Sequence, residues 1–379
     1  MAVVKRSTPK QPILALNCGS SSLKFGIYEA TESTADLVAE GEAQEVGRAN
    51  GTFRLRGARG YESCDVEEQR PYPDHAAAFQ HAFESLRRFE FPTPQAIGHR
   101  FVHGGPGIRE HVKFTPKIYE QLGEAVAYAP LHIPPALSVL DAARQTLPDI
   151  PQVICLDTAF HRNMPEVSRF FALPYEMAQH GVQRYGFHGL SLESILAQLD
   201  PVPDRLVAAH LGNGASVTAI RNSMSVDTTM GLTPTGGIMM GTRCGDLDPG
   251  VMIYLLRNGY STAEKLEHLV DKESGMLGIS GTSSDVRELL RARGKNSQAD
   301  LALRMFCYQA RKAIAAMGAV LGGIDLLVFT GGIGEHAEGL RNEICAGLHF
   351  MGLDQSRIQV RSSEEDAQIC KITAGLANS

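Results

Sequence analysis

The 379-residue sequence predicts an α/β fold divided into two domains. Its length exceeds the size at which one hydrophobic core stops growing, so two domains are the natural expectation. Three short apolar segments each run into a glycine-containing polar loop, at residues 17–24, 210–214 and 330–335. Between the last two loops, residues 301–321 carry apolar side chains at near-helical spacing. Strands that alternate with helices are typical of α/β architecture.

The first loop follows the apolar run 13–16 and precedes a second strand-like segment at 25–28. It contains Asn17, Gly19, three serines and Lys24. Glycine lets the backbone approach a ligand closely, hydroxyl and N–H groups donate to anionic oxygens, and lysine adds a positive charge. These residues favour a phosphate-binding loop, with a serine-rich surface hairpin as the alternative. The sequence contains neither a Walker A pattern nor a G-x-G-x-x-G that opens a helix.

The second loop, 210–214, connects strand-like segments at 206–209 and 215–220. Its distance from the first loop is what a duplicated α/β unit would produce, although two hairpins alone leave duplication open. The third loop, 330–335, follows a strand-like run at 326–329 and precedes a polar helix start. A buried strand that feeds a glycine turn and a helix is a frequent nucleotide site, and a simple connection is the alternative. Residues 301–321 are interpreted as a core helix.

Two charged residues are expected at the ends of apolar strands. Arg100 lies in the strand-like context 98–105, and its planar guanidinium suits either a structural carboxylate or an anionic ligand. Asp157 ends the apolar run 153–156, where active-site carboxylates of open sheets are found, although a turn or helix cap is the alternative. A proline-rich turn at 130–135 holds His132.

Two further candidates have glycine neighbours. His188 lies between Gly186 and Gly189 without a second ligand at metalloprotease spacing, so no zinc site is predicted. Arg243 precedes the aspartates at 246 and 248, and this cluster suits either a clamp on a phosphoryl group or a loop held by ion pairs. Phosphoryl transfer relies mostly on positioning and charge neutralisation, so the whole set favours that reaction. No G-x-S-x-G elbow supports serine hydrolysis.

Composition excludes several other classes. The net charge of −6 and the pI near 6.1 provide no basic field for nucleic acid. Seven cysteines without a C-x-x-C pair fit a reduced compartment, so we expect a cytoplasmic protein. Neither a signal-peptide core nor a long apolar run is present, and we expect no membrane association.

The motifs together resemble the acetate kinase family, in that family's order and over most of the chain. They are Asn-x-Gly-Ser-Ser-Ser-Leu-Lys at 17–24, Gly-His-Arg-x-Val-His-Gly-Gly at 98–105, Asp-Thr-Ala-Phe-His at 157–161, Arg-Tyr-Gly-Phe-His-Gly at 184–189, His-Leu-Gly-Asn-Gly at 210–214, Met-Gly-Thr-Arg-x-Gly-Asp-Leu-Asp-Pro at 240–249 and Gly-Ile-Gly-Glu at 332–335. The resemblance implies the superfamily of acetate and sugar kinases, Hsp70 and actin. Its members have two duplicated actin-like (ribonuclease H-like) α/β domains around a nucleotide cleft. The expected domains are 1–159 with a C-terminal segment of about 367–379, and 160–366, which would carry the nucleotide loops and the interface of a homodimer.

The resemblance also implies reversible transfer of the ATP γ-phosphoryl group to acetate, with Mg²⁺ or Mn²⁺, giving acetyl phosphate and ADP. Residues carried over as catalytic are Arg100, Asp157, His188 and Arg243. Those carried over for the acyl substrate are Arg100, Val102, Leu131, His132, Phe187 and Pro234. Those carried over for ATP are Lys24, His210, Leu211, Gly212, Asn213, Gly214, Asp285, Val286, Arg287, Gly332, Ile333, Gly334, Glu335 and His336. Asn17 and Glu365 would hold the metal.

The chain departs from the family's usual pattern at Ile133, at Gly236 and at His336, where polar, acidic and asparagine side chains are usual. These departures leave open a preference for propionate or butyrate, since one or two methylenes change selectivity by only about 1–3 kcal/mol. A pyrophosphate-linked kinase is a further alternative. A non-enzymatic ATP-binding protein of the Hsp70 or actin type would share the fold, but it would not need an acyl-carboxylate site.

Overall fold

The computed structural model describes residues 9–58 and 60–377, which form two compact units. The first unit contains the described residues up to Ala159, Gly189–Ser194, and those from Glu364 onward. The second contains Phe160–His188 and Ile195–Ser363. Relative to the expected domains, residues 189–194 and 364–366 belong to the first unit rather than the second.

The first unit is built on an eight-stranded sheet with the order β5-β4-β3-β2-β1-β6-β8-β7. β1 pairs antiparallel with β2 and parallel with β6, and β6 pairs parallel with β8. The strands are β1 (Gln11–Cys18), β2 (Ser22–Ala30), β3 (Ala35–Gln44), β4 (Thr52–Gly57), β5 (Asp65–Gln69), β6 (Ala96–Phe101), β7 (Val112–Lys113) and β8 (Gln152–Leu156).

The second unit has a five-stranded sheet with the order β11-β10-β9-β12-β13. Its strands are β9 (Arg205–Leu211), β10 (Ala215–Arg221), β11 (Met224–Thr228), β12 (Leu326–Thr330) and β13 (Ile358–Val360). β9, β10 and β11 form an antiparallel meander, and β12 and β13 continue the sheet in parallel with β9. The strands β3-β2-β1-β6-β8 follow the same scheme, which confirms the predicted duplication of an α/β unit.

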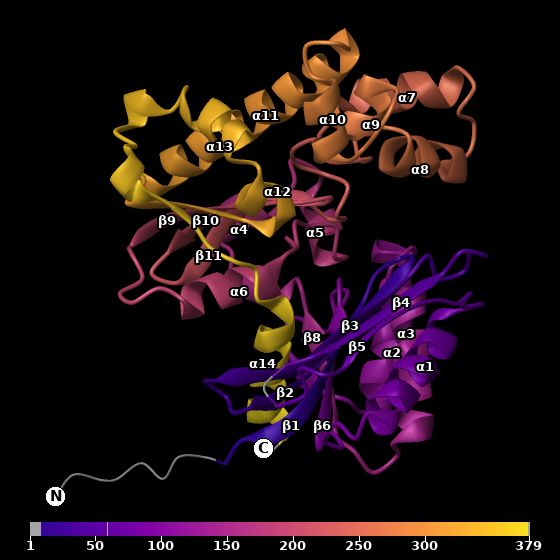
Figure 1. The fold of residues 1–379 in the computed structure, drawn as a ribbon. Helices are drawn as coiled ribbons and strands as arrows, with labels where there is room; N and C mark the ends of the chain where they lie inside the picture. The colour runs from indigo at the N-terminus through magenta and orange to yellow at the C-terminus, as the bar shows by residue number, and fades with distance from the viewer. Residues whose placement is uncertain (1–8, 59, 378–379) are drawn as a thin grey trace, which may run out of the picture. The chain divides into compact units, whose positions relative to one another are not determined.

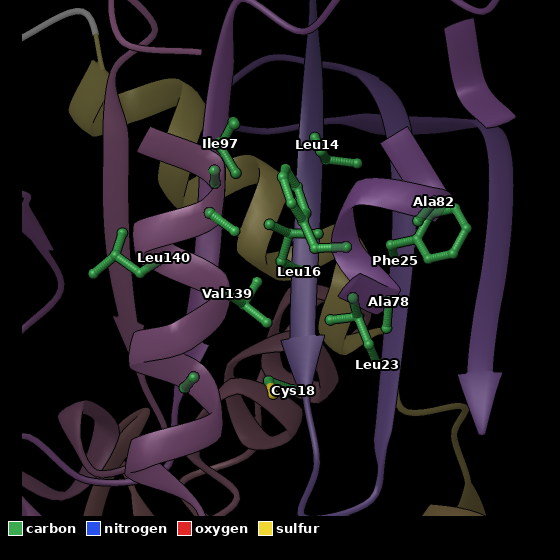
Figure 2. Packing of buried hydrophobic residues seen from close by; sticks show 14 of the residues in the cluster. Leu14, Leu16, Cys18, Leu23, Phe25, Ala78, Ala82, Ile97, Val139 and Leu140 are labelled. Carbon is green, nitrogen blue, oxygen red and sulfur yellow. The ribbon is translucent and has the colours of Figure 1, made fainter. Parts of the chain in front are cut away.

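Helices cover both faces of the first sheet because successive residues of β1 point to opposite sides. Leu14 and Leu16 pack with residues of α1 (His75–Arg88) and α3 (Ile133–Thr146), as Figure 2 shows. Ile13 and Ala15 belong to a separate cluster with α14 (Glu365–Ala377), the yellow helix at the end of the chain in Figure 1. α2 (Pro116–Glu124) lies alongside α3.

A glycine on β6 allows α14 to approach the sheet. A Cβ atom on Gly98 would lie 2.3 Å from Thr373 Oγ1 and 2.5 Å from Ile369 Cγ2. Such distances are far below van der Waals contact, so a larger residue would push the helix away. Gly98 therefore fixes the depth of α14, whose first turn carries Glu365 and Asp366.

The second unit is organised around α11 (Ser297–Leu321), which packs on β9 and β10. Its buried positions, which include Leu303, Phe306, Ala310 and Ile314, recur at helical spacing and confirm the helix predicted at 301–321. The other helices of this unit are α4 (Glu166–Arg169), α5 (Tyr175–Gln179), α7 (Pro249–Arg257), α8 (Ala263–Lys272), α9 (Gly275–Ser280), α10 (Val286–Ala292), α12 (Gly331–His336) and α13 (Glu338–Cys345), while α6 (Gly189–Ala197) continues from the first unit. No helix within 9–58 and 60–377 combines the length and apolarity needed to cross a membrane.

The predicted polar loops are shorter than expected. β1 and β2 stay paired as far as Cys18 and Leu23, so Asn17 and Lys24 lie opposite each other on strands and only Gly19–Ser21 form the turn. Likewise, His210 and Leu211 belong to β9. The prediction of a third glycine loop was wrong in form, because residues 331–336 are α12 and α13 follows at Glu338. The prediction of a turn at 130–135 holds only to His132, because α3 begins at Ile133 and its first turn contains Pro134 and Pro135.

We expect His99 to make the protein less stable in acid. Its Nε2 lies 2.7 Å from Gln152 Oε1, and burial lowers its pKa to about 4. The unfolded chain binds this proton near pH 6.5, so stability present at pH 7 should fall by roughly 3 kcal/mol as the pH drops from about 6.5 to 4. Urea unfolding of the wild type and His99→Gln at pH 7 and pH 4.5 measures this. Equal losses in both proteins would contradict it.

Candidate functional site

The end of the first sheet carries a buried ion pair. Arg100 lies near the end of β6 and Asp157 directly follows β8, and parallel pairing of these strands brings the two residues together. Arg100 Nε donates to Asp157 Oδ1 at 3.0 Å and Nη2 donates to Oδ2 at 2.6 Å. The Asp157 side chain is 2% exposed and that of Arg100 is 18% exposed. Part of the Arg100 side chain therefore stays exposed while its Nε and Nη2 groups are held by the carboxylate.

Burial and charge act in opposite directions on this pair. Burial raises the pKa of the Asp157 carboxyl, and the Arg100 guanidinium acts against that rise. For Arg100, burial acts to lower the pKa, but Asp157 and Glu365 outweigh it and raise the pKa. Arg100 is therefore charged throughout the physiological range, and it offers a fixed positive edge to an anionic ligand.

Asn17 connects the ion pair to the start of α14. Its register partner on the neighbouring strand β6 is Arg100. Asn17 Oδ1 accepts from Arg100 Nη1 at 2.8 Å, and Nδ2 donates to Asp366 Oδ1 at 3.2 Å and to Glu365 Oε2 at 3.5 Å. Glu365 Oε2 also lies 3.9 Å from Arg100 Nη1. The first unit thus brings together Asn17, Arg100, Asp157 and Glu365, and it adds Asp366, which sequence reasoning missed.

The carboxylates of Glu365 and Asp366 fit a hard divalent cation. Mg²⁺ usually binds through one or two carboxylates and completes its shell with water and phosphate oxygens. Burial raises the pKa of Asp366 to about 6, and the charge of Lys24 opposes this rise. Asn17 presents its amide N–H groups to the carboxylates, so its role beside a metal would be to orient them. Within the described chain, no group of three or more His, Cys, Asp and Glu side chains could hold a metal.

Two carbonyl groups of the hairpin turn Gly19–Ser21 accept hydrogen bonds from the protein. Gly19 O accepts from His75 Nε2 at 3.0 Å, and Ser21 O accepts from the Val46 backbone at 3.0 Å. Gly19 N itself bonds to Ser22 O. Both interpretations of this turn are compatible with these contacts, and phosphate binding stays a prediction.

In the second unit, His188 is held in a left-handed backbone conformation, with φ = 60°. Its Nδ1 lies 2.9 Å from Ser216 Oγ, and its ring stacks on His210 with centroids 4.1 Å apart. The preceding residue, Phe187, is held by the buried His161, whose Nε2 donates to Phe187 O at 3.0 Å. The other ring nitrogen, Nδ1, then accepts from Ser225 Oγ at 2.7 Å. Sequence reasoning missed Ser216 and His161 as supports of this histidine.

His188 and Arg243 converge beside Gly214. A Cβ atom on Gly214 would lie 3.2 Å from His188 Nε2 and 3.4 Å from Arg243 Nη1. Arg243 Nη1 donates to Pro234 O at 3.2 Å, within the loop that leads into it. An imidazole nitrogen and a guanidinium nitrogen beside one small volume suit an anionic group that gains charge during a reaction.

The aspartates after Arg243 have structural roles. Asp246 Oδ1 accepts from Gly237 N at 2.7 Å, and Asp248 Oδ1 caps α7 by accepting from Gly250 N at 2.8 Å. These contacts shape the 237–250 loop through backbone amides.

A cavity of about 510 Å³ lies next to these residues in the second unit. Its lining includes eight predicted ATP residues, namely Gly212, Asn213, Asp285, Val286, Arg287, Gly332, Ile333 and His336. Ser284, Leu290 and Ala337 complete the lining and were not predicted. Apolar walls with a few polar groups suit a nucleoside.

The remaining ATP predictions fall outside that lining. Glu335 Oε1 accepts from Gly331 N and Ser363 N, each at 3.0 Å, and Gly334 O accepts from Arg341. Lys24 belongs to β2 of the first unit. His210, Leu211 and Gly214 belong to or follow β9, beside the cavity residues Gly212 and Asn213.

The predicted acyl-binding residues come from both units. Val102, Leu131 and His132 belong to the first, and Phe187 and Pro234 belong to the second. Leu131 is 37% exposed, whereas Phe187 is buried in the core of the second unit. Ile133 is fully buried in the core of the first unit. The acyl pocket stays a prediction.

Adding a methyl group at Gly214 should disturb the donors around it. Gly214→Ala would force His188 Nε2 or Arg243 Nη1 to move by a few tenths of an ångström, and we expect kcat to fall by roughly tenfold. Gly123→Ala is the matched control, because its Cβ meets nothing within 4 Å. Steady-state kinetics of both variants measures the effect, and equal kcat values would contradict it.

Comparison with known proteins adds the family context. The sequence model of the acetokinase family matches residues 12–375. A relative named acetate kinase from Rhodopseudomonas palustris is 43% identical over 353 residues, which cover 90% of this chain and 87% of the relative. The crystal structure of Porphyromonas gingivalis acetate kinase superposes with a TM-score of 0.85 at 34% identity, covering 97% of this chain and 99% of that one. A propionate kinase from Francisella tularensis gives 0.88 at 32% identity, covering 97% and 100%.

Proposed function

The chain belongs to the acetokinase family and is a kinase that phosphorylates a carboxylate, and we propose that its reaction is reversible phosphoryl transfer from ATP to acetate. The single observation that carries this proposal is the geometry of Arg100. Its Nε and Nη2 groups are fixed by Asp157 and part of its side chain stays exposed, which suits an arginine that binds a carboxylate. A purely nucleotide-binding protein has no use for such a group.

In this proposal the two units bind different substrates. Arg100 in the first unit binds the substrate carboxylate, which is already ionised at neutral pH and needs no strong base. In the second unit, the 510 Å³ cavity takes the nucleotide, and His188 and Arg243 donate to the transferring phosphoryl group. The main barrier is repulsion between two anions, and fixed donors lower it without reorganisation.

Glu365 and Asp366 would hold the metal ion, with Asn17 orienting their carboxylates. Mg²⁺ supplies neutralisation of phosphate charge when it is bound. Because Glu364 is exposed and lies next to Glu365, Glu364→Gln is the matched control for Glu365→Gln. We expect only Glu365→Gln to raise the Mg²⁺ concentration needed for half-maximal rate, by tenfold or more. If only Glu364→Gln raised that concentration, Glu364 rather than Glu365 would be the residue that binds the metal.

The function is tested by offering Mg-ATP with acetate, propionate or butyrate and trapping the acyl phosphate as the hydroxamate. Acetate with the highest kcat/KM, and loss of product in Arg100→Ala, would support the proposal. A parallel assay replaces ATP by pyrophosphate. Product in that assay alone would identify pyrophosphate as the phosphoryl donor. No product with any acid, but with ATP hydrolysis, would favour the nucleotide-binding alternative.

Propionate is the second candidate acceptor, because the chain is similar to a propionate kinase at 32% identity and a TM-score of 0.88. A higher kcat/KM for propionate than for acetate in the same assay would select it. A larger acyl group adds only about 1–3 kcal/mol of discrimination, so the comparison must use kcat/KM values under identical conditions.

We infer direct in-line transfer without a phosphorylated enzyme. In this proposal His188 and Arg243 neutralise charge on the transferring phosphoryl group, and transfer between two bound substrates then needs no covalent step. Incubation with γ-³²P-labelled ATP tests the inference. A labelled protein that passes its phosphate to acetate as fast as the overall reaction would contradict it.

We also propose a cytoplasmic homodimer. The seven free cysteines fit a reducing compartment. α7 has none of its residues buried although it carries Val251, Ile253, Tyr254 and Leu256, each at least 39% exposed, and a second copy would cover them. Light scattering should find a dimer that Ile253→Asp dissociates and that Met224→Asp, at an exposed site on β11, leaves intact. A monomeric wild type would contradict this, and cell fractionation tests the compartment.

A further inference from the structure

A histidine outside the residues described so far bonds to the last residue of β8, which directly precedes Asp157. His111 immediately precedes β7, the edge strand that pairs antiparallel with β8. The backbone N–H of Leu156 donates to His111 Nδ1 at 3.1 Å. An N–H group can only donate, so Nδ1 is the unprotonated nitrogen and Nε2 carries the hydrogen. Leu156 is the residue just before Asp157.

The second ring nitrogen of His111 bonds to a glutamate of α6. His111 Nε2 lies 3.1 Å from Glu193 Oε1 and 3.2 Å from Oε2, so it donates to this carboxylate. Gln368 on α14 donates to the same carboxylate at 3.4 Å. The side chains of His111 and Glu193 are 14% and 17% exposed, so both are largely shielded from water.

These contacts close a ring around Asp157. α6 begins at Gly189, whose backbone N–H donates to the carbonyl oxygen of Asp157 at 2.8 Å. The ring runs from Asp157 through Leu156, His111, Glu193 and the first turn of α6, and it returns through Gly189. All of these residues belong to the first unit. A backbone held from both sides restricts the side chain it carries, and here that side chain fixes Arg100.

We propose that His111 is a positioning residue that, together with Glu193, holds the backbone of Asp157 and through it the carboxylate-binding edge of Arg100. His111 acts through Asp157 and does not touch the substrate. The inference rests on the proposed function, because it assigns the purpose of the ring to the carboxylate site of that reaction.

Two substitutions separate the two nitrogens of His111. An asparagine places its amide oxygen near the position of Nδ1, so His111→Asn keeps an acceptor for Leu156 N–H and loses Glu193. A glutamine places its amide nitrogen near Nε2, so His111→Gln keeps the donor to Glu193 and loses Leu156. We expect kcat/KM for acetate to fall at least tenfold in His111→Gln and less than threefold in His111→Asn, with KM for ATP unchanged in both.

His81 provides the control, because it lies in the same unit and both of its ring nitrogens also contact polar groups, one of them a glutamate. Its Nδ1 lies 2.7 Å from Tyr72 Oη, its Nε2 lies 2.9 Å from Glu68, and its side chain is 11% exposed. His81→Gln should lower the melting temperature about as much as His111→Gln and leave kcat/KM within twofold of the wild type. Glu193→Gln keeps an acceptor for Nε2–H and should stay within threefold.

Amide hydrogen exchange of residues 152–157 gives a readout that does not depend on activity. Exchange should be faster in His111→Gln than in the wild type, and unchanged in His111→Asn and His81→Gln. Equal activity losses in His111→Gln and His81→Gln, the opposite order of the two His111 variants, or unchanged exchange would overturn the proposal. A wild type that forms no acyl phosphate would overturn the proposed function instead, and the catalytic purpose of the ring with it.

Discussion

Replacing Arg100 by alanine is expected to lower kcat/KM for the carboxylate substrate by about 10²–10³-fold and to destabilise the first unit by roughly 3 kcal/mol. The catalytic loss follows from the proposed role of Arg100, which is to bind the substrate carboxylate. The loss of stability arises because Asp157, 2% exposed, would keep a buried charge without its partner. Hydroxamate trapping measures the first effect and urea unfolding measures the second.

The double variant Arg100→Met with Asp157→Leu separates these two effects. Replacing a buried ion pair by apolar residues of similar size is often neutral for stability. We therefore expect the double variant to regain most of the lost free energy of unfolding while it remains as inactive as Arg100→Ala. Activity that returns together with stability would mean that the pair only supports the fold.

Replacing His188 by asparagine should lower kcat by about 10²–10³-fold with little change in KM for ATP. Asparagine tolerates the left-handed backbone of this position better than alanine does, so the variant should keep its fold. It removes the Nε2 group beside Arg243 and Gly214 and the ring that stacks on His210.

Ser216→Ala is the companion to His188→Asn. It removes the partner of Nδ1 and leaves the His188 ring in place, so a smaller loss in kcat is expected. Steady-state kinetics with thermal unfolding of both variants measures the two effects. If His188→Asn kept a kcat within threefold of the wild type, His188 would not act on the phosphoryl group.

Local patterns in the sequence were enough to predict the hairpins and the core helix. Periodicity over 301–321 predicted α11, and apolar runs predicted β1, β9 and β12. The extent of the turns was missed because antiparallel pairing carries Asn17 and Lys24 into strands. α12 was missed because glycine disfavours helices, but Glu335 satisfies the N–H of Gly331 at its start.

The candidate site was predictable as residue types but not as a geometry. Asn17, Arg100 and Asp157 meet because three parallel strands end side by side, and register is a property of the folded sheet. Asp366 follows Glu365 directly, and its position in the first turn of α14 was the signal that could have identified it. His161 and Ser216 act through His188, and a buried supporting residue leaves no distinct pattern in one sequence.

The position of α14 has a consequence for the synthesis of the chain. The Arg100 cluster takes one residue from β1, others from β6 and the end of β8, and its acidic groups from a helix near residue 379. The same helix covers one face of the sheet at Ile13, Ala15 and Gly98. The first unit is therefore completed only after the second unit has been synthesised, and the proposed carboxylate site lacks its acidic residues until α14 has left the ribosome.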